Sequence, residues 1–174
     1  GEEGQDLYQK RDRDARPRSQ STPGRAYRHR DGRRKGGAMR YHLSVNRTIS
    51  GKLPKDATPA RWARFNDAFE NCELSAAQIA AEIQAGHAIA AVHHGRRKRD
   101  NWRMAQHIGI DLDDGSMSWD EVTALPLVDH HAAIVHTTAS STPAHPRMRV
   151  LFLLDEPCDD PDTYTFIVGC FLRA

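Results

Sequence analysis

Short apolar runs, separated by helix-start signals, follow one another from Met39 onward, and this alternation constrains the fold most strongly. Runs with the length and composition of strands lie at 40–46, 87–93, 107–113, 131–137 and 148–154. Capping residues predict helix starts at Thr58, Ser75, Ser118 and Asp160. Strands interleaved with helices predict an α/β (α+β) domain, with a mixed sheet flanked by helices.

Residues 1–38 differ from the rest of the chain, because they have almost no aliphatic side chains and are rich in Arg, Gly and Pro. Such a segment buries too little apolar surface to offset its ordering entropy. We therefore expect a disordered basic tail, which is either a solvated segment or an arm that touches nucleic-acid phosphates. Residues 39–174 have the length of one domain, and we expect that domain to continue beyond Ala174.

Cysteine usage and hydropathy exclude two classes of protein. The three cysteines lie far apart and include no CxxC pair, which argues against a zinc knuckle or a disulfide framework. No apolar run approaches the roughly 20 residues that span a bilayer. The sequence therefore predicts a cytoplasmic protein with no membrane partner.

The segment IGIDLDDG at 108–115 places two carboxylates, Asp111 and Asp113, at the end of an apolar run. Side chains two residues apart on a strand share one face. Same-face carboxylates repel each other unless a cation such as Mg²⁺ or Mn²⁺ neutralises them. Two such ions can activate a 3′-hydroxyl and stabilise a departing pyrophosphate. The alternative is an ordinary acidic turn at the end of a strand.

The segment IVHTTASSTPAHPRMRVLFLLDEP at 134–157 combines a hydroxyl-rich turn with two arginines. Arg147 and Arg149 share one face by the same two-residue period, and paired guanidiniums suit phosphate oxygens. If the strands at 107–113 and 148–154 lie in one sheet, carboxylates and arginines face a common cleft suited to a metal-bound nucleoside triphosphate. The alternative is an exposed strand face whose arginines pair with Asp111 or Asp155.

In this order, GIDLDD and HTTASSTPAHPRMRVLFLLDEP resemble the first two motifs of the archaeo-eukaryotic primase superfamily, in its phage, plasmid and mobile-element branches. The resemblance implies the N-terminal part of a primase–polymerase catalytic domain at 39–174. It implies that Asp111 and Asp113 are the catalytic, metal-binding carboxylates. It implies nucleotide binding by a second group of residues: Ser140, Ser141, Thr142, His145, Arg147 and Arg149.

The sequence departs from the family at the histidine of the second motif, which contacts the incoming nucleotide, because Ser141 stands in its place. His145 and His136 lie close enough in sequence to substitute for it. The family's third acidic ligand would lie beyond Ala174, so we expect this fragment to be inactive alone. The resemblance also implies a DNA primase or polymerase with nucleoside triphosphates, a single-stranded DNA template and a C-terminal helicase domain as partners.

A basic run at Arg96, Arg97 and Lys98 precedes the first motif, as in that family, and we expect it to contact template or triphosphate. A solvated basic loop is the alternative interpretation.

Two other functions stay open. IGIDLDDGS also resembles the nucleophile motif of haloacid dehalogenase-type phosphohydrolases, with Asp111 attacking phosphorus and Asp113 as acid/base. That family places Gly directly after the second Asp, where Asp114 stands here, and gives the Pro-Arg-x-Arg strand no role. The other possibility is a non-catalytic nucleic-acid-binding replication module, which the Ser141 departure favours.

Overall fold

The structure, a computed structural model, describes residues 39–173, so the expectation of a disordered tail at 1–38 lies outside it. The strands are β1 (Arg40–Asn46), β2 (Glu70–Ser75), β3 (Ala88–Ala90), β4 (Val92–His93), β5 (Trp102–Leu112), β6 (Ile134–Thr137) and β7 (Met148–Cys158). The helices are α1 (Pro59–Asp67), α2 (Ala76–Gln84), α3 (Trp119–Ala124), α4 (Pro126–His131) and α5 (Pro161–Phe171), with a short 3₁₀ turn at Arg99–Asn101.

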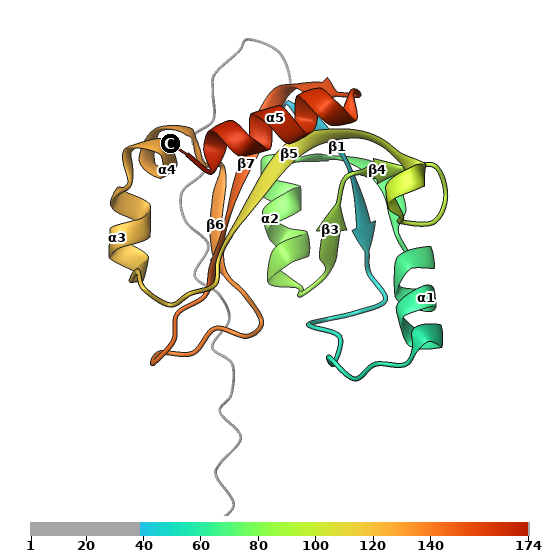
Figure 1. The fold of residues 1–174 in the computed structure, drawn as a ribbon, viewed down its shortest axis with the longest axis horizontal. Helices are drawn as coiled ribbons and strands as arrows, with labels where there is room; N and C mark the ends of the chain where they lie inside the picture. The colour runs from blue at the N-terminus through green and yellow to red at the C-terminus, as the bar shows by residue number, and fades with distance from the viewer. Residues whose placement is uncertain (1–38, 174) are drawn as a thin grey trace, which may run out of the picture.

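These elements form an α+β fold, as the sequence predicts, but the expected mixed sheet is two antiparallel sheets. One has the strand order β2-β1-β3 and the other β4-β5-β7-β6. The single apolar run at 87–93 is divided at Ala91, so that β3 pairs with β1 while β4 pairs with β5. This division joins the two sheets into one curled surface (Figure 1).

The helix starts follow the capping signals in the sequence. Ser75 and Ser118 each form a complete capping box at the starts of α2 and α3. The side chains of Thr58 and Asp160 accept hydrogen bonds from the backbone of α1 and α5, and a proline follows each cap. All four predicted starts are therefore confirmed. Strand β2 and helix α4 were not predicted.

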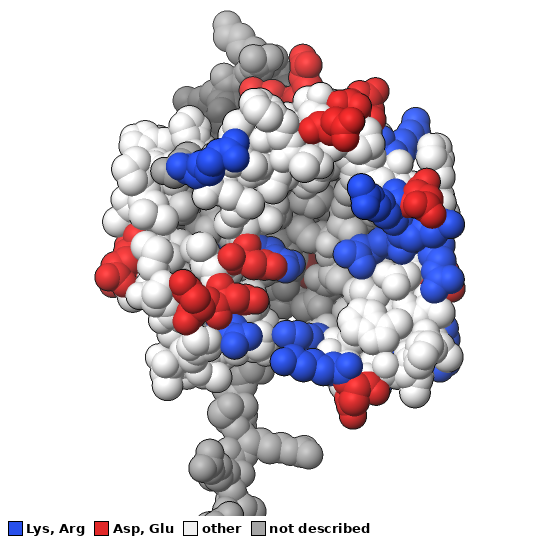
Figure 2. All heavy atoms as spheres, in the orientation of Figure 1, with Lys and Arg blue, Asp and Glu red and all other residues white. Residues whose placement is uncertain are grey.

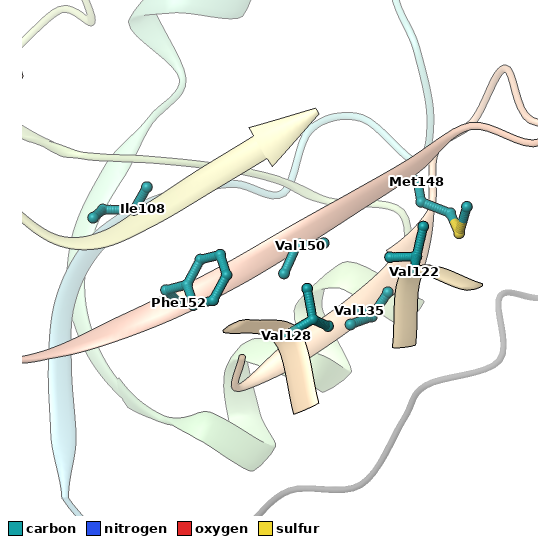
Figure 3. Packing of buried hydrophobic residues seen from close by; sticks show 7 residues of the cluster. All are labelled: Ile108, Val122, Val128, Val135, Met148, Val150 and Phe152. Atoms are coloured by element: carbon teal, nitrogen blue, oxygen red, sulfur yellow. The ribbon is translucent and has the colours of Figure 1, made fainter. Parts of the chain in front are cut away.

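Alternate residues of β5 and β7 supply the main apolar core (Figure 3). Ile108, Val150 and Phe152 point to one side of the sheet, where α3, α4 and α5 cover them. The opposite side carries Leu151 into a second cluster with β1 and α2. Within the described residues, no helix is long and apolar enough to cross a bilayer.

Candidate functional site

A cavity of about 350 Å³ opens on the side of the β5–β7–β6 sheet that α3, α4 and α5 leave uncovered. Its walls come from the ends of β5 and β6, the loop after β1, the end of α2, and β3. Figure 2 shows this face hollowed near its centre, with acidic and basic side chains at the rim of the hollow. The side chains of chemical interest in the lining are Lys52, His87, Asp111, Asp113, His136, Thr138, Ser140 and Arg149.

Asp111 and Arg149 meet across two neighbouring strands at this cavity. They are direct partners in the antiparallel register of β5 and β7. Arg149 donates from Nε to Asp111 Oδ1 at 2.5 Å and from Nη2 to Oδ2 at 2.9 Å, a forked pair. The hydrogen bonds from Arg149 hold the pKa of Asp111 below its usual value, and they raise the pKa of Arg149. Both groups are therefore charged at neutral pH.

Asp113 lies one residue beyond the end of β5 and lines the same cavity as Asp111. The two carboxylates thus share one side of the strand, as the two-residue period predicts. Asp114 has a local role instead, since its Oδ1 accepts hydrogen bonds from the backbone N–H and the hydroxyl of Ser116. Of the three aspartates in the segment 108–115, only Asp111 and Asp113 line the cavity.

These two carboxylates fit a hard divalent cation. Among residues 39–173 there is no group of three or more His, Cys, Asp or Glu side chains able to enclose a metal ion. Mg²⁺, however, is commonly held by one or two carboxylates together with waters and substrate phosphates. An ion at Asp111 and Asp113 would depend on such additional ligands. Because Arg149 occupies both oxygens of Asp111, sharing that carboxylate with a cation would require Arg149 to shift towards another anion.

His136 is one of two histidines that line the cavity, and it lies beside Arg149. It is the register partner of Arg149 on β6, and its Nδ1 lies 3.0 Å from the carbonyl oxygen of Thr137. Burial lowers the pKa of His136, and the charge of Arg149 lowers it further. The ring is therefore neutral, and its Nδ1 is engaged with the backbone carbonyl of Thr137. Its other nitrogen, Nε2, is then the atom that can contact a ligand.

His145 lies outside the cavity lining and packs in a turn. Its ring lies against Gly115, whose φ of +73° and lack of a side chain allow the approach. Its backbone forms an isolated bridge with Thr142. His145 thus packs the turn after Asp113 against the hairpin between β6 and β7. Of the two histidines near the second motif, the fold brings only His136 to the cavity.

The hydroxyl-rich turn is divided between the cavity and its own hydrogen bonds. Thr138 and Ser140 line the cavity, whereas the Ser141 hydroxyl accepts a hydrogen bond from the backbone N–H of Arg147 at 2.9 Å. Arg147 precedes β7 and is absent from the cavity lining. Its Nε is buried and has no hydrogen-bond partner among the described residues. The structure therefore brings Arg149 to the carboxylates and leaves Arg147 in the turn.

Two further lining residues have no signal in the sequence. Lys52, in the loop after β1, donates from Nζ to the Ser140 hydroxyl at 3.4 Å. His87, after α2, has its Nδ1 2.6 Å from Oε2 of Glu82. Arg47 donates to the other oxygen of that carboxylate and lowers the pKa of Glu82. Glu82 thus fixes the orientation of an imidazole that faces the cavity.

The basic run lies beside α1, in the loop between β4 and β5. Arg96 pairs with Asp67 at 3.2 Å and Lys98 with Asp100 at 3.7 Å. Arg97 instead stacks over the Phe69 ring, with its guanidinium carbon 5.3 Å from the ring centroid. None of the three lines the cavity, so the fold separates them from the carboxylates.

No family model matches this chain, and neither the curated proteins nor the solved structures compared with it give a significant match. The interpretation of the cavity therefore rests on its own geometry and chemistry.

Proposed function

We propose that this cavity binds a metal-complexed nucleoside triphosphate and that the protein carries out nucleotidyl transfer of the primase–polymerase type. The observation that supports the proposal is the convergence of Asp111, Asp113, Arg149 and His136 on a single cavity from three strands. Carboxylates suit a cation, and a forked guanidinium suits the phosphates that the cation accompanies. A volume of about 350 Å³ lies within the range of small-molecule sites.

Each side chain has a task that its surroundings favour. Asp111 and Asp113 would hold Mg²⁺ or Mn²⁺, which supplies charge neutralisation at the reacting phosphate when it is bound. Arg149 would transfer one or both of its donated hydrogen bonds from Asp111 to a phosphate oxygen. Neutral His136 can donate or accept one hydrogen bond through Nε2, and it would substitute for the second-motif histidine, whose position Ser141 occupies. Lys52 and Ser140 add a charge and a hydroxyl to the cavity lining.

The phosphohydrolase alternative is less well supported by this geometry. That scheme gives no task to Arg149, whose guanidinium covers both oxygens of the supposed nucleophile Asp111. In the proposed function the same guanidinium moves to a phosphate oxygen. As a metal ligand, Asp111 would contribute its negative charge to a bound cation and would form no covalent bond to phosphorus. A stable aspartyl-phosphate on Asp111 would reverse this preference.

The proposal is tested by the incorporation of labelled nucleotide on a single-stranded template, with Mg²⁺ or Mn²⁺ and the full-length gene product. We expect Asp113→Asn to abolish synthesis while circular dichroism and the unfolding transition stay unchanged, because Asp113 is exposed and makes no core contact. Asp114→Asn is the matched control, since it removes the neighbouring charge outside the cavity. Normal synthesis by Asp113→Asn would overturn the metal assignment.

A further inference from the structure

Helix α1 begins a row of three aromatic rings that ends at Phe69, two residues beyond the helix. None of its residues is buried, and Trp62 is 41% exposed. The rings of Trp62 and Phe65 meet edge to face with centroids 5.8 Å apart, and Phe65 meets Phe69 in the same manner at 5.3 Å. Trp62 and Phe65 lie on α1 at helical spacing, and Phe69, half-buried like Phe65, continues the row after the helix ends. We call Trp62, Phe65 and Phe69 the aromatic row.

Three guanidinium groups lie next to the aromatic row. Arg97 lies over Phe69, and its Nη1 donates to Asn66 Oδ1 at 3.2 Å, which fixes its position. On the helix itself, Arg61 and Arg64 are exposed and form no ion pair with any residue of 39–173. A polyanion that followed the row would therefore meet three positive charges whose attraction is not cancelled by an acidic partner.

The flanking charges extend from α1 towards the cavity. In Figure 2, blue side chains gather to the right of the central hollow, between α1 and the loop that joins β4 to β5. Arg97 and Arg149 are close enough for their charges to interact, since the pKa of Arg97 is lowered first by burial and then by Arg149. The charge of Arg97 is therefore within electrostatic range of Arg149, although Arg97 does not line the cavity.

We propose that the aromatic row, with Arg61, Arg64 and Arg97 beside it, is a stacking platform for single-stranded nucleic acid. Unpaired bases offer π-faces to an exposed ring, and the adjacent phosphates are attracted by guanidiniums. A duplex offers its phosphates but keeps its base faces stacked inside, so the exposed Trp62 ring favours a single strand. The role of this strand as template rests on the proposed function, whereas the platform itself rests on α1, Phe69 and Arg97.

The test measures the binding of a fluorescein-labelled oligothymidine to the full chain by anisotropy over a series of salt concentrations. Residues 1–38 are present in every variant, so their contribution to binding is common to all. We expect Trp62→Ala to raise Kd about tenfold, as loss of one stacked base does, and Trp62→Phe to retain most of the affinity. Arg61→Gln and Arg64→Gln should each reduce the slope of log Kd against log salt by about 0.7, the value for one phosphate contact on a single strand.

Arg173→Gln is the matched control, because it removes the same charge just after α5, a helix whose apolar residues pack on the β5–β7 core. If Trp62→Ala, Arg61→Gln and Arg64→Gln all bind the oligonucleotide as Arg173→Gln does, the platform is refuted. Its failure is distinguishable from failure of the proposed function. Loss of oligonucleotide binding on Trp62→Ala, in a protein that incorporates no nucleotide, would keep the platform and reject nucleotidyl transfer.

Discussion

The two sides of the β5–β7 sheet are built from the same strands but have opposite chemistry. On one side Val150 and Phe152 pack under three helices, and their exposed fractions are 2% and 3%. On the other side Arg149, the residue before Val150, and its partner Asp111 on β5 reach a cavity as a charged pair. The comparison shows that a two-residue period lets one strand serve the core and a binding site at once. Stability and ligand binding should therefore respond to different substitutions on adjacent residues.

The largest expected effect is on the helix-covered side. Phe152→Ala removes a ring that packs against Phe171 with centroids 4.7 Å apart. We expect the free energy of unfolding to fall by about 3–5 kcal/mol, from lost apolar burial and the cavity left behind. Urea denaturation followed by circular dichroism measures the change. The two sides would not be separable if Asp113→Asn lowered stability as much as Phe152→Ala.

The second effect concerns a titratable group on the side away from α3, α4 and α5. Burial, with a smaller contribution from the charge of Arg149, lowers the pKa of His107 to about 4. The unfolded chain takes up this proton below about pH 6.5 and the folded chain only near pH 4, so stability falls as pH decreases through that window. The loss is on the order of 3 kcal/mol at most.

Urea denaturation at several pH values between these limits checks the expectation. His107→Gln should flatten the dependence, while the exposed His130→Gln should keep the slope of the wild-type protein. A wild-type slope in His107→Gln would show that another group carries the titration.

The third effect distinguishes two arginines that lie two residues apart, Arg147 just before β7 and Arg149 on it. Arg149→Ala removes a forked donor from the cavity, and we expect the Kd for a nucleoside triphosphate with Mn²⁺ to rise about 30-fold, on the order of 2 kcal/mol. Arg147→Ala changes a residue outside the cavity lining and should alter this Kd much less. Isothermal titration calorimetry measures both. Equal losses would show that the turn as a whole, and not Arg149, binds the phosphates.

The smallest effect is on the stability contributed by the charged pair. Asp111 and Arg149 are 46% and 39% exposed, and ion pairs at such positions contribute about 0–1 kcal/mol. We therefore expect Asp111→Asn to shift the unfolding midpoint only slightly, while nucleotide binding with Mn²⁺ falls sharply. A large loss of stability with unchanged binding would make the pair structural.

Local signals explain what the sequence predicted well. The capping boxes at Ser75 and Ser118 depend on residues three positions apart, and the shared side of Asp111 and Asp113 depends on strand geometry alone. The pairing of Asp111 with Arg149 needed only the further condition that their strands be neighbours. The capping boxes and the shared side of the two carboxylates can therefore be predicted with little information about the tertiary fold.

The remaining features depend on contacts between distant segments. Lys52 and His87 reach the cavity from a loop and a helix end that no local pattern connects to Asp111. Arg147 has the spacing of a cavity residue, but the strand begins one residue later and its backbone closes the turn with Ser141. The predicted strand at 87–93 divides at Ala91, because its first half pairs with β1 in one sheet and its second half pairs with β5 in the other. Such outcomes are decided by tertiary pairing.

Anomalous scattering from a crystal soaked with Mn²⁺ and a non-hydrolysable nucleoside triphosphate tests the central claim most directly. We expect a manganese peak at the carboxylates of Asp111 and Asp113, with the triphosphate beside Arg149 and His136. Manganese and nucleotide bound elsewhere, or a cavity that stays empty at saturating concentrations of both, would contradict it.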